Sequence, residues 1–296
     1  MLALARLALG TAQPLAPDFA AWLGERLFFT PPRQSLPDGA RSLLRRGRRF
    51  RITVDGKPVQ GWRWGRGPAV YLLHGWGGRG GRYLHFIEPL TELGHSVVVF
   101  DAPGHGANPH GMSSAPEFAR ALQAVVELCG PAHAVVAHSL GAAAAGLAVN
   151  WGLRPGRLVL LAPPMDVTEF FEPFARAVGM TPAVMARLVA RSTRRIGVDW
   201  SELDVRRHAP KEPLPLLVVH DVGDKVVPFA DGVAIAEAWG GQLHATEGLG
   251  HTGLLRDREV LRTVAAFVTG AAPEDVAAAV DPAAKAERWL WERYRR

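Results

Sequence analysis

Short apolar runs alternate with longer stretches of helical periodicity along most of the chain. Continuous apolar runs bounded by turn residues predict strands that are buried on both faces of a sheet. The runs that fit this description are residues 69–73, 96–100, 132–137, 157–161 and 215–219, and residues 242–246 are predicted as a further strand. Five helical patterns lie between or after them. Two of these end near Leu93 and Asn150, and the other three span residues 116–128, 230–239 and 256–268. This alternation predicts an α/β fold, with a mostly parallel sheet and helices on both faces.

Two departures from the alternation add detail to this fold. Residues 50–54 and 59–64 have strand patterns on either side of Asp55-Gly56, a dipeptide typical of tight hairpin turns, so an N-terminal β-hairpin is predicted. Residues 166–208, after the fourth parallel strand, have helical patterning and no strand pattern. We expect a helical cap over the carboxyl edge of the sheet, where open α/β sheets bind ligands. Helical packing unrelated to any ligand is the alternative.

The pattern therefore divides the chain into four parts. These are an N-terminal helical extension (1–49), the α/β core (50–165 and 209–270), the cap (166–208) and a C-terminal helix (271–296).

The N-terminal extension has the composition of a helical layer. Phe19, Trp22, Leu23 and Leu27 recur at helical spacing, and we expect them to pack on the core of the protein and not on a membrane. The first residues lack a basic segment and a clean small-x-small cleavage site, and no apolar run reaches the roughly 20 residues of a membrane span. A cytoplasmic protein without a membrane partner is expected.

Composition and charge narrow the functional classes. The 296 residues are 48% hydrophobic and 21% charged, with a net charge of +6. These values are typical of an ordinary globular protein. The arginines between Arg41 and Arg51 predict a solvated surface more than a nucleic-acid site, so no nucleic acid partner is expected. A single cysteine, Cys129, excludes an intramolecular disulfide and any multi-cysteine metal site. No metal and no cofactor are predicted, and the oligomeric state is left open.

The sharpest chemical signal is the segment 135–141, VVAHSLG, which leads into a helix of small residues. An apolar strand here runs into small-x-Ser-x-small, with Ala137 and Gly141 flanking Ser139 at two residues on either side. A serine in such a strand-to-helix turn has a strained backbone, and larger flanking side chains would collide across the turn. This geometry presents the Ser139 hydroxyl above the sheet. A chance serine capping a helix is the simpler alternative.

From about Phe50 to Val268 the chain resembles the α/β-hydrolase family, whose catalytic residues follow the order nucleophile, acid, histidine. After Ser139, the segments 220–228 (HDVGDKVVP) and 248–251 (GLGH) resemble the acid and histidine loops of that family. The resemblance implies a triad of Ser139, Asp224 and His251. Asp221 is the rival acid, but it adjoins the strand end and is expected to bond backbone or cap groups.

The chemistry of a serine nucleophile requires these residue types. A serine hydroxyl needs a neutral imidazole within hydrogen-bond reach to take its proton, and that imidazole needs a carboxylate on its other nitrogen. His138 adjoins Ser139, but the residue beside the nucleophile points away from its hydroxyl. The turn 101–106 (DAPGHG) resembles a structural turn of the family, with Ala107-Asn108 where a serine usually follows.

The segment 74–78, HGWGG, resembles the oxyanion loop of the family, and the backbone N–H groups of Trp76 and Leu140 are the expected donors. Residues 75–80 also satisfy G-x-G-x-x-G, with Asp101 about 20 residues further on, as a dinucleotide-binding fingerprint requires. That alternative, an NAD-dependent oxidoreductase, leaves Ser139, Asp224 and His251 without a role.

The predicted function is a serine hydrolase that cleaves carboxylic esters or thioesters of a small-molecule substrate through an acyl-enzyme. Apolar residues of the cap suggest an apolar acyl or aryl group: Met165, Phe170, Phe171, Phe174 and Met180. A lactonase, a serine-dependent C–C-bond hydrolase and a non-catalytic member of the same fold are alternatives.

Overall fold

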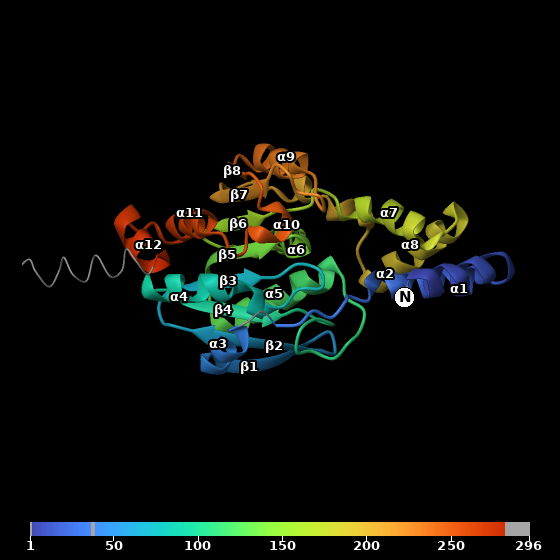
Figure 1. The fold of residues 1–296 in the computed structure, drawn as a ribbon, viewed down its shortest axis with the longest axis horizontal. Coiled ribbons are helices and arrows are strands. Elements are labelled where there is room, and N and C mark those ends of the chain that lie inside the picture. Colours follow the sequence, from blue (N-terminus) through green and yellow to red (C-terminus); the bar gives the residue numbers. More distant parts are fainter. Residues whose placement is uncertain (1, 37–38, 282–296) are drawn as a thin grey trace, which may run out of the picture.

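The protein is built around one eight-stranded sheet, seen in a computed structural model that describes residues 2–36 and 39–281 (Figure 1). The strand order is β1-β2-β4-β3-β5-β6-β7-β8. The strands are β1 (Arg48–Val54), β2 (Lys57–Trp64), β3 (Ala69–Leu73), β4 (Ser96–Asp101), β5 (Ala132–His138), β6 (Leu158–Leu161), β7 (Leu216–Asp221) and β8 (Gln242–Thr246). Strand β2 pairs antiparallel with β1 and β4, and β3 to β8 are parallel. The predicted fold class is confirmed.

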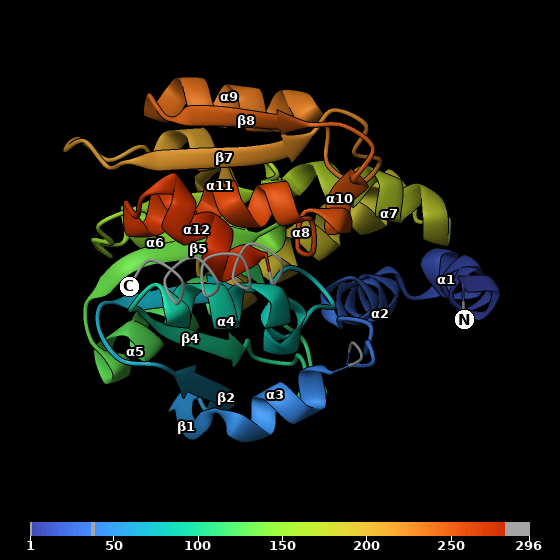
Figure 2. The same ribbon diagram turned by 60° about the vertical axis from the view of Figure 1, so that its left-hand side comes forward.

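Helices cover both faces of the sheet, as the buried apolar strands require. In β3, Val70 and Leu72 belong to one core and Tyr71 and Leu73 to the other, because successive side chains point to opposite faces. The first core lies under α4 (Leu84–Glu92), α11 (Arg258–Thr269) and α12 (Pro273–Val280). The second lies under α5 (Ala115–Cys129), α6 (Leu140–Asn150) and α9 (Phe229–Trp239) (Figure 2). The part of the predicted C-terminal helix after residue 281 lies outside the described residues.

The N-terminal hairpin is confirmed. Strands β1 and β2 pair from Arg48 with Arg63 through to Val54 with Lys57. Asp55 and Gly56 form the turn with positive φ values of 49° and 73°. Positive φ at both central residues is typical of the two-residue turn whose twist suits an antiparallel pair of strands. Asp-Gly favours these φ values, and the dipeptide therefore predicted the hairpin.

The predicted cap residues form a helical insertion between β6 and β7. It comprises η2 (Val167–Phe170), α7 (Phe171–Val178), α8 (Pro182–Ile196), η3 (Trp200–Leu203) and η4 (Val205–His208). Three N-terminal helices precede the sheet: α1 (Leu2–Leu15), α2 (Pro17–Phe29) and α3 (Ala40–Arg46). Helix α2 packs on α8 and α1 packs on α2 and α7. The insertion and the first two helices together form a layer beyond the carboxyl ends of the parallel strands (Figure 1).

The expectation that the apolar residues of α2 pack on the core is wrong for most of them. Phe19 is 53% exposed, and Trp22 and Leu27 are each 39% exposed, while Leu23 is half-buried. Phe19 and Trp22 stack on each other with ring centroids 5.4 Å apart. Apolar spacing alone indicates a helical face but not the direction in which that face points.

Close packing of α2 against α8 explains the reversed orientation. The buried side of α2 carries Ala20, Ala21 and Gly24, and a Cβ at Gly24 would collide with Met180. Glu25 on this side is also buried, and its carboxylate pairs with two arginines of α8. Small residues and one ion-paired acid therefore fill this part of the interface, and Phe19 and Trp22 remain on the outside, whereas Phe29 at the end of α2 is buried.

Candidate active site

Ser139 occupies a strained turn between β5 and α6. Its backbone has φ 55° and ψ −125°, a conformation that L-residues rarely adopt and that a sharp strand-to-helix turn imposes. A Cβ at Gly141 in the same turn would collide with the carbonyl oxygen of His74, and Ala137 is fully buried. The small residues at these two positions therefore permit the turn, for the steric reason that the sequence analysis gave.

His251 connects the serine to an acid. It lies in α10 (Gly250–Gly253), directly after β8, and its Nε2 is 2.9 Å from Ser139 Oγ. Its Nδ1 is 2.7 Å from Oδ2 of Asp224, in the loop after β7. Because a carboxylate only accepts, the neutral ring donates Nδ1–H to Asp224 and leaves the Nε2 lone pair for the serine hydroxyl. This is the tautomer that a general base needs.

The Asp224 carboxylate is fixed by its own loop. The side chain is fully buried, and Oδ1 accepts hydrogen bonds from the amides of Val226 at 2.8 Å and Val227 at 3.1 Å. Burial acts to raise the pKa of Asp224, but these hydrogen bonds and the one from His251 outweigh it and hold the pKa below its usual value. The acid is therefore charged and correctly oriented at neutral pH.

Asp221 has a different environment. Its carboxylate accepts hydrogen bonds from the Gly223 amide at 3.0 Å, the Thr246 hydroxyl at 3.0 Å and the Leu249 amide at 2.8 Å. Burial acts to raise its pKa, but the hydrogen bonds from Leu249 and Thr246 keep it below the usual value. Asp221 thus ties together the loops that carry Asp224 and His251, as the expected backbone bonding implies.

His138 supports His251 from behind. Its Nε2 lies 2.8 Å from the backbone oxygen of His251, and the two rings are 4.8 Å apart. Burial lowers the pKa of His138 to about 3, so the ring is neutral and donates Nε2–H to that oxygen. The His138 ring thus donates to the backbone of His251, and Ser139 Oγ pairs instead with the His251 ring.

The predicted oxyanion loop lies against Ser139. A Cβ at Gly75 would sit 2.8 Å from the Cβ of Ser139, so glycine permits this close approach. His74 fixes the loop, because its Nδ1 is 2.8 Å from the Gly75 oxygen and its Nε2 accepts the Ala102 amide at 3.0 Å. Burial lowers the pKa of His74 to about 4, in agreement with this neutral tautomer. The loop that carries Trp76 and the first residue of α6, Leu140, therefore both adjoin the serine.

Asp101 has a structural environment that does not suit a dinucleotide. It is 1% exposed, and its two carboxylate oxygens accept the amides of Gly80 and Ala107, each at 2.7 Å. Asn108 takes part in the same turn by donating to the backbone oxygens of Asp101 and Ala102. A carboxylate buried in this way is not available to a ribose hydroxyl, so the feature that the NAD interpretation needs is not present here.

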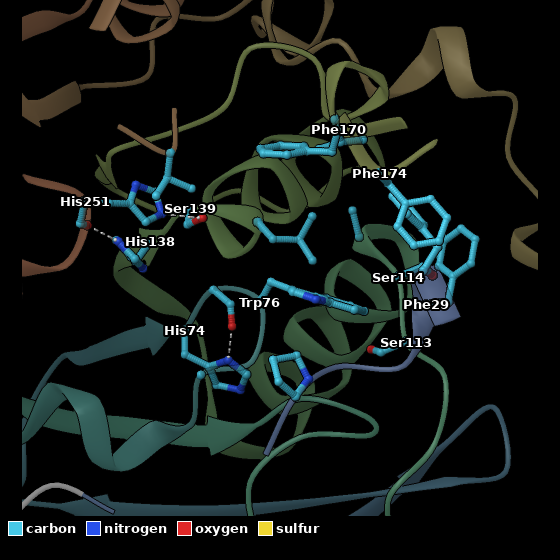
Figure 3. A pocket seen from close by; sticks show the side chains of 18 of the residues that line it. Phe29, His74, Trp76, Ser113, Ser114, His138, Ser139, Phe170, Phe174 and His251 are labelled. Carbon is cyan, nitrogen blue, oxygen red and sulfur yellow. Dashed lines mark hydrogen bonds between the residues drawn. The ribbon is translucent and has the colours of Figure 1, made fainter. Parts of the chain in front are cut away.

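An apolar cavity of about 690 Å³ begins at Ser139 (Figure 3). Ser139 and His251 lie at one end, Phe29 and Phe174 at the other, and Trp76 between them. The cap contributes Val167, Phe170, Pro173, Phe174, Ala177, Trp200 and Leu203, and the N-terminal segment contributes Leu27, Phe28, Phe29, Thr30, Pro32 and Gln34. The volume and lining suit a small apolar ligand group.

Sequence reasoning identified only part of this lining. Of the five apolar cap residues proposed for it, Phe170 and Phe174 line the cavity, whereas Met165, Phe171 and Met180 do not. Phe171 is 9% exposed and packs against Phe28 and Trp200. The N-terminal wall was missed because nothing in the local pattern of residues 27–34 indicates a contact with the cap. Within residues 2–36 and 39–281, no group of three His, Cys, Asp or Glu side chains could hold a metal ion.

Comparison with known proteins places this geometry in a family. The family model described as serine aminopeptidase, S33, matches residues 67–204. An uncharacterized protein of Mycobacterium tuberculosis (strain ATCC 25618 / H37Rv) is 31% identical over 261 residues, which is 82% of this chain and 86% of the relative.

Two further similarities concern proteins with a named activity. A pimeloyl-[acyl-carrier protein] methyl ester esterase of Chromobacterium violaceum is 34% identical over 130 residues, covering 42% of this chain and 48% of the relative. The structure of a Pyrococcus furiosus esterase superposes with a TM-score of 0.62 at 21% identity, over 81% of this chain and 98% of the esterase. The second similarity concerns the fold alone. Together with the matched family and the 31% identical relative, the order of strands and loops shows that this chain belongs to the α/β-hydrolase family.

Proposed function

We propose that the protein is a serine hydrolase that cleaves carboxylic esters, or thioesters, with an apolar acyl or aryl group. The observation that carries the proposal is the hydrogen-bonded series Ser139, His251 and Asp224, with distances of 2.9 and 2.7 Å, at one end of an apolar cavity. A serine, a correctly tautomeric histidine and a buried charged acid are together what acyl transfer requires.

The mechanism follows from this arrangement. Ser139 Oγ attacks the acyl carbon while His251 Nε2 takes its proton, and Asp224 stabilises the imidazolium that forms. The negative oxygen of the tetrahedral intermediate is stabilised by the backbone N–H groups of Trp76 and Leu140, of which the second lies at the N-terminus of α6. His251 then returns the proton to the leaving alcohol or thiol. Water, activated by the same histidine, hydrolyses the acyl-enzyme.

The composition of the cavity supports an apolar acyl or aryl group. Four phenylalanine, two tryptophan and four leucine side chains are among the residues that line it. Contacts with such a wall stabilise large apolar substrates, whereas the triad and the oxyanion donors act on every ester alike. A lactone or a C–C bond beside a carbonyl would use the same residues, so the assay includes them.

The test is a panel of p-nitrophenyl esters of increasing chain length, together with acyl-coenzyme A thioesters, lactones and a C–C-bond substrate, assayed with wild type and Ser139→Ala. We expect ester hydrolysis to fall by about three to six orders of magnitude in the variant. Ser113→Ala is the matched control, because Ser113 lines the same cavity and its hydroxyl has no hydrogen-bond partner among the described residues. Residual activity of Ser139→Ala within tenfold of wild type would contradict the proposal.

The two neighbouring histidines provide a second comparison. His251→Ala should lose as much activity as Ser139→Ala, because the base and the nucleophile act as one unit. His138→Ala should mainly lower the melting temperature, since His138 contacts the backbone of His251 and not the serine hydroxyl. Equal losses of activity in the two histidine variants would contradict the assignment of His251 as the base.

A further inference from the structure

The first two helices carry an uncovered apolar surface. Six of the ten large apolar side chains that are exposed in the described residues belong to them. They are Leu4, Leu7 and Leu15 of α1, which are 71%, 66% and 86% exposed, and Phe19, Trp22 and Leu27 of α2. We call these six residues the N-terminal apolar face. Such a concentration of exposed apolar side chains on two adjoining helices points to an interaction site.

The three leucines of α1 in this face are exposed because the opposite side of this helix is bonded to the cap. Leu9 is fully buried, and the Arg6 guanidinium donates to the Ala177 oxygen at the end of α7. Gln13 donates to the Gly179 oxygen and accepts the Thr181 amide. Helix α1 is therefore held against the cap by its polar residues and Leu9, whereas Leu4, Leu7 and Leu15 are exposed to solvent.

Positive charge lies directly beside the N-terminal apolar face. A recess of about 360 Å³ between α2 and α8 is lined by four arginines, Arg26, Arg191, Arg194 and Arg195, and by one acid, Glu25. Glu25 pairs with Arg191 and Arg195, whereas Arg194 has no ion pair with the described residues. Trp22 also lines this recess, so the apolar face and the arginine recess share a residue.

The N-terminal apolar face shares one residue with the cavity that contains Ser139. Leu27 is 39% exposed and also lines the cavity, and Phe28 and Phe29, the next residues of α2, form its wall. The Arg195 guanidinium lies 4.2 Å above the Phe29 ring, so the arginine recess and the cavity are separated by a single side chain. Leu27 thus belongs both to the outer surface of α2 and to the lining of the cavity that contains Ser139.

We propose that α1 and α2 dock the protein onto the surface of an anionic phospholipid bilayer. The N-terminal apolar face inserts among the acyl chains near the headgroups, and the arginine recess binds lipid phosphates. Apolar and aromatic side chains beside arginines suit this partner, because the surface of such a membrane is negative while its interior is apolar. No helix in residues 2–36 and 39–281 is long and apolar enough to cross a bilayer.

This proposal replaces the expectation that the protein has no membrane partner. That expectation rested on Phe19, Trp22, Leu23 and Leu27 packing inward, and the first two and Leu27 are exposed. It also goes beyond the proposed function, because binding to a bilayer does not require hydrolysis.

The test is co-sedimentation of the full chain with vesicles of phosphatidylcholine alone or mixed with phosphatidylglycerol. Wild type should bind the mixed vesicles more tightly than those of phosphatidylcholine alone. Leu7→Glu should weaken this binding roughly tenfold or more, because the leucine that inserts into the bilayer is replaced by a charged side chain. Leu128→Glu is the matched control, since Leu128 is a 54% exposed leucine at the end of α5 and should bind like wild type. Equal binding by wild type and Leu7→Glu would overturn the proposal.

The arginine recess is tested separately. Arg194→Gln should weaken binding to the anionic vesicles about fivefold and leave binding to phosphatidylcholine unchanged. Arg66→Gln, an exposed arginine in the turn between β2 and β3, should have no effect. Absence of any preference of wild type for the anionic vesicles would also overturn the proposal. So would a wild-type dimer that does not bind vesicles and that Leu7→Glu converts to a monomer.

Failure of the two proposals can be told apart. Ser139→Ala should bind vesicles like wild type, and Leu7→Glu should hydrolyse a water-soluble acetate ester like wild type. Wild type that binds anionic vesicles but hydrolyses no ester would contradict only the proposed function. Wild type that hydrolyses esters but does not bind these vesicles would contradict only membrane docking.

Discussion

Replacing Asp224 by Asn should abolish most of the activity and leave the fold intact. Replacing Asp221 by Asn should instead lower the stability of the fold and reduce activity far less. In the wild-type structure Asp224 Oδ2 lies 2.7 Å from His251 Nδ1, and Oδ1 accepts the Val226 and Val227 amides. An asparagine that keeps its oxygen toward the two amides presents an NH₂ group to His251. The imidazole then has to place its proton on Nε2, where it faces the serine and cannot accept the hydroxyl proton.

The magnitude follows from this inversion of the tautomer. The same change in a serine protease triad lowers kcat by about 10⁴, which corresponds to about 5.4 kcal/mol of transition-state stabilisation. Asp221 makes none of these contacts, but its carboxylate accepts three hydrogen bonds, from Gly223, Thr246 and Leu249. An amide in its place leaves a buried donor unpaired, at a cost of about 1–3 kcal/mol in the free energy of unfolding.

Two measurements on each variant separate these effects. The first is kcat/KM with a p-nitrophenyl ester, and the second is the free energy of unfolding from urea titration. We expect Asp224→Asn to lose activity by about 10⁴ with nearly wild-type stability, and Asp221→Asn to lose stability with activity reduced far less. If Asp221→Asn were the more severe catalytic defect in folded protein, Asp224 would not be the acid of this site.

Two further predictions concern the cavity and the buried histidines. Phe174→Ala should change the ratio of octanoate to acetate kcat/KM by roughly 10- to 200-fold because Phe174 lines the cavity, whereas Phe171→Ala should cost about 3–5 kcal/mol of stability with the ratio unchanged. An unchanged ratio in folded Phe174→Ala would show that the cap does not set chain length. Burial lowers the pKa of His74 to about 4 and those of His105 and His138 to about 3, so the unfolded chain binds protons below about pH 6.5 that the folded protein does not. The free energy of unfolding should therefore fall as the pH drops from 6.5 toward 4, by up to about 1.4 kcal/mol per pH unit for each histidine. Urea titrations that give equal stability at pH 6.5 and pH 4 would contradict this prediction.

The core of the fold was predictable because its determinants are local. The strands 69–73 and 242–246 were placed at their observed ends, since each is a short run bounded by turn residues. The carboxyl ends of β5, β7 and β8 lie at the same edge of the parallel sheet, and the resemblance to the α/β-hydrolase family identified Ser139, Asp224 and His251 in the loops that follow them.

The cavity wall and the surface were not predictable in the same way. Whether Phe171 or Phe174 faces the substrate depends on how α7 rotates against α2, and this rotation is set by contacts with Phe28, far away in the sequence. The exposure of Trp22 depends likewise on the small Gly24 side of α2, which approaches α8 more closely than a larger residue could. Long-range packing of this kind leaves no periodic signal in the sequence.

The central claim is that Ser139 is the residue that becomes acylated. The most direct measurement is to react the protein with a fluorophosphonate and to locate the adduct by mass spectrometry of its peptides, with Ser139→Ala and Ser113→Ala treated in parallel. A single adduct on Ser139, present in Ser113→Ala and lost in Ser139→Ala, is the predicted result. An adduct on another residue, or ester hydrolysis that continues in fully labelled protein, would contradict the account.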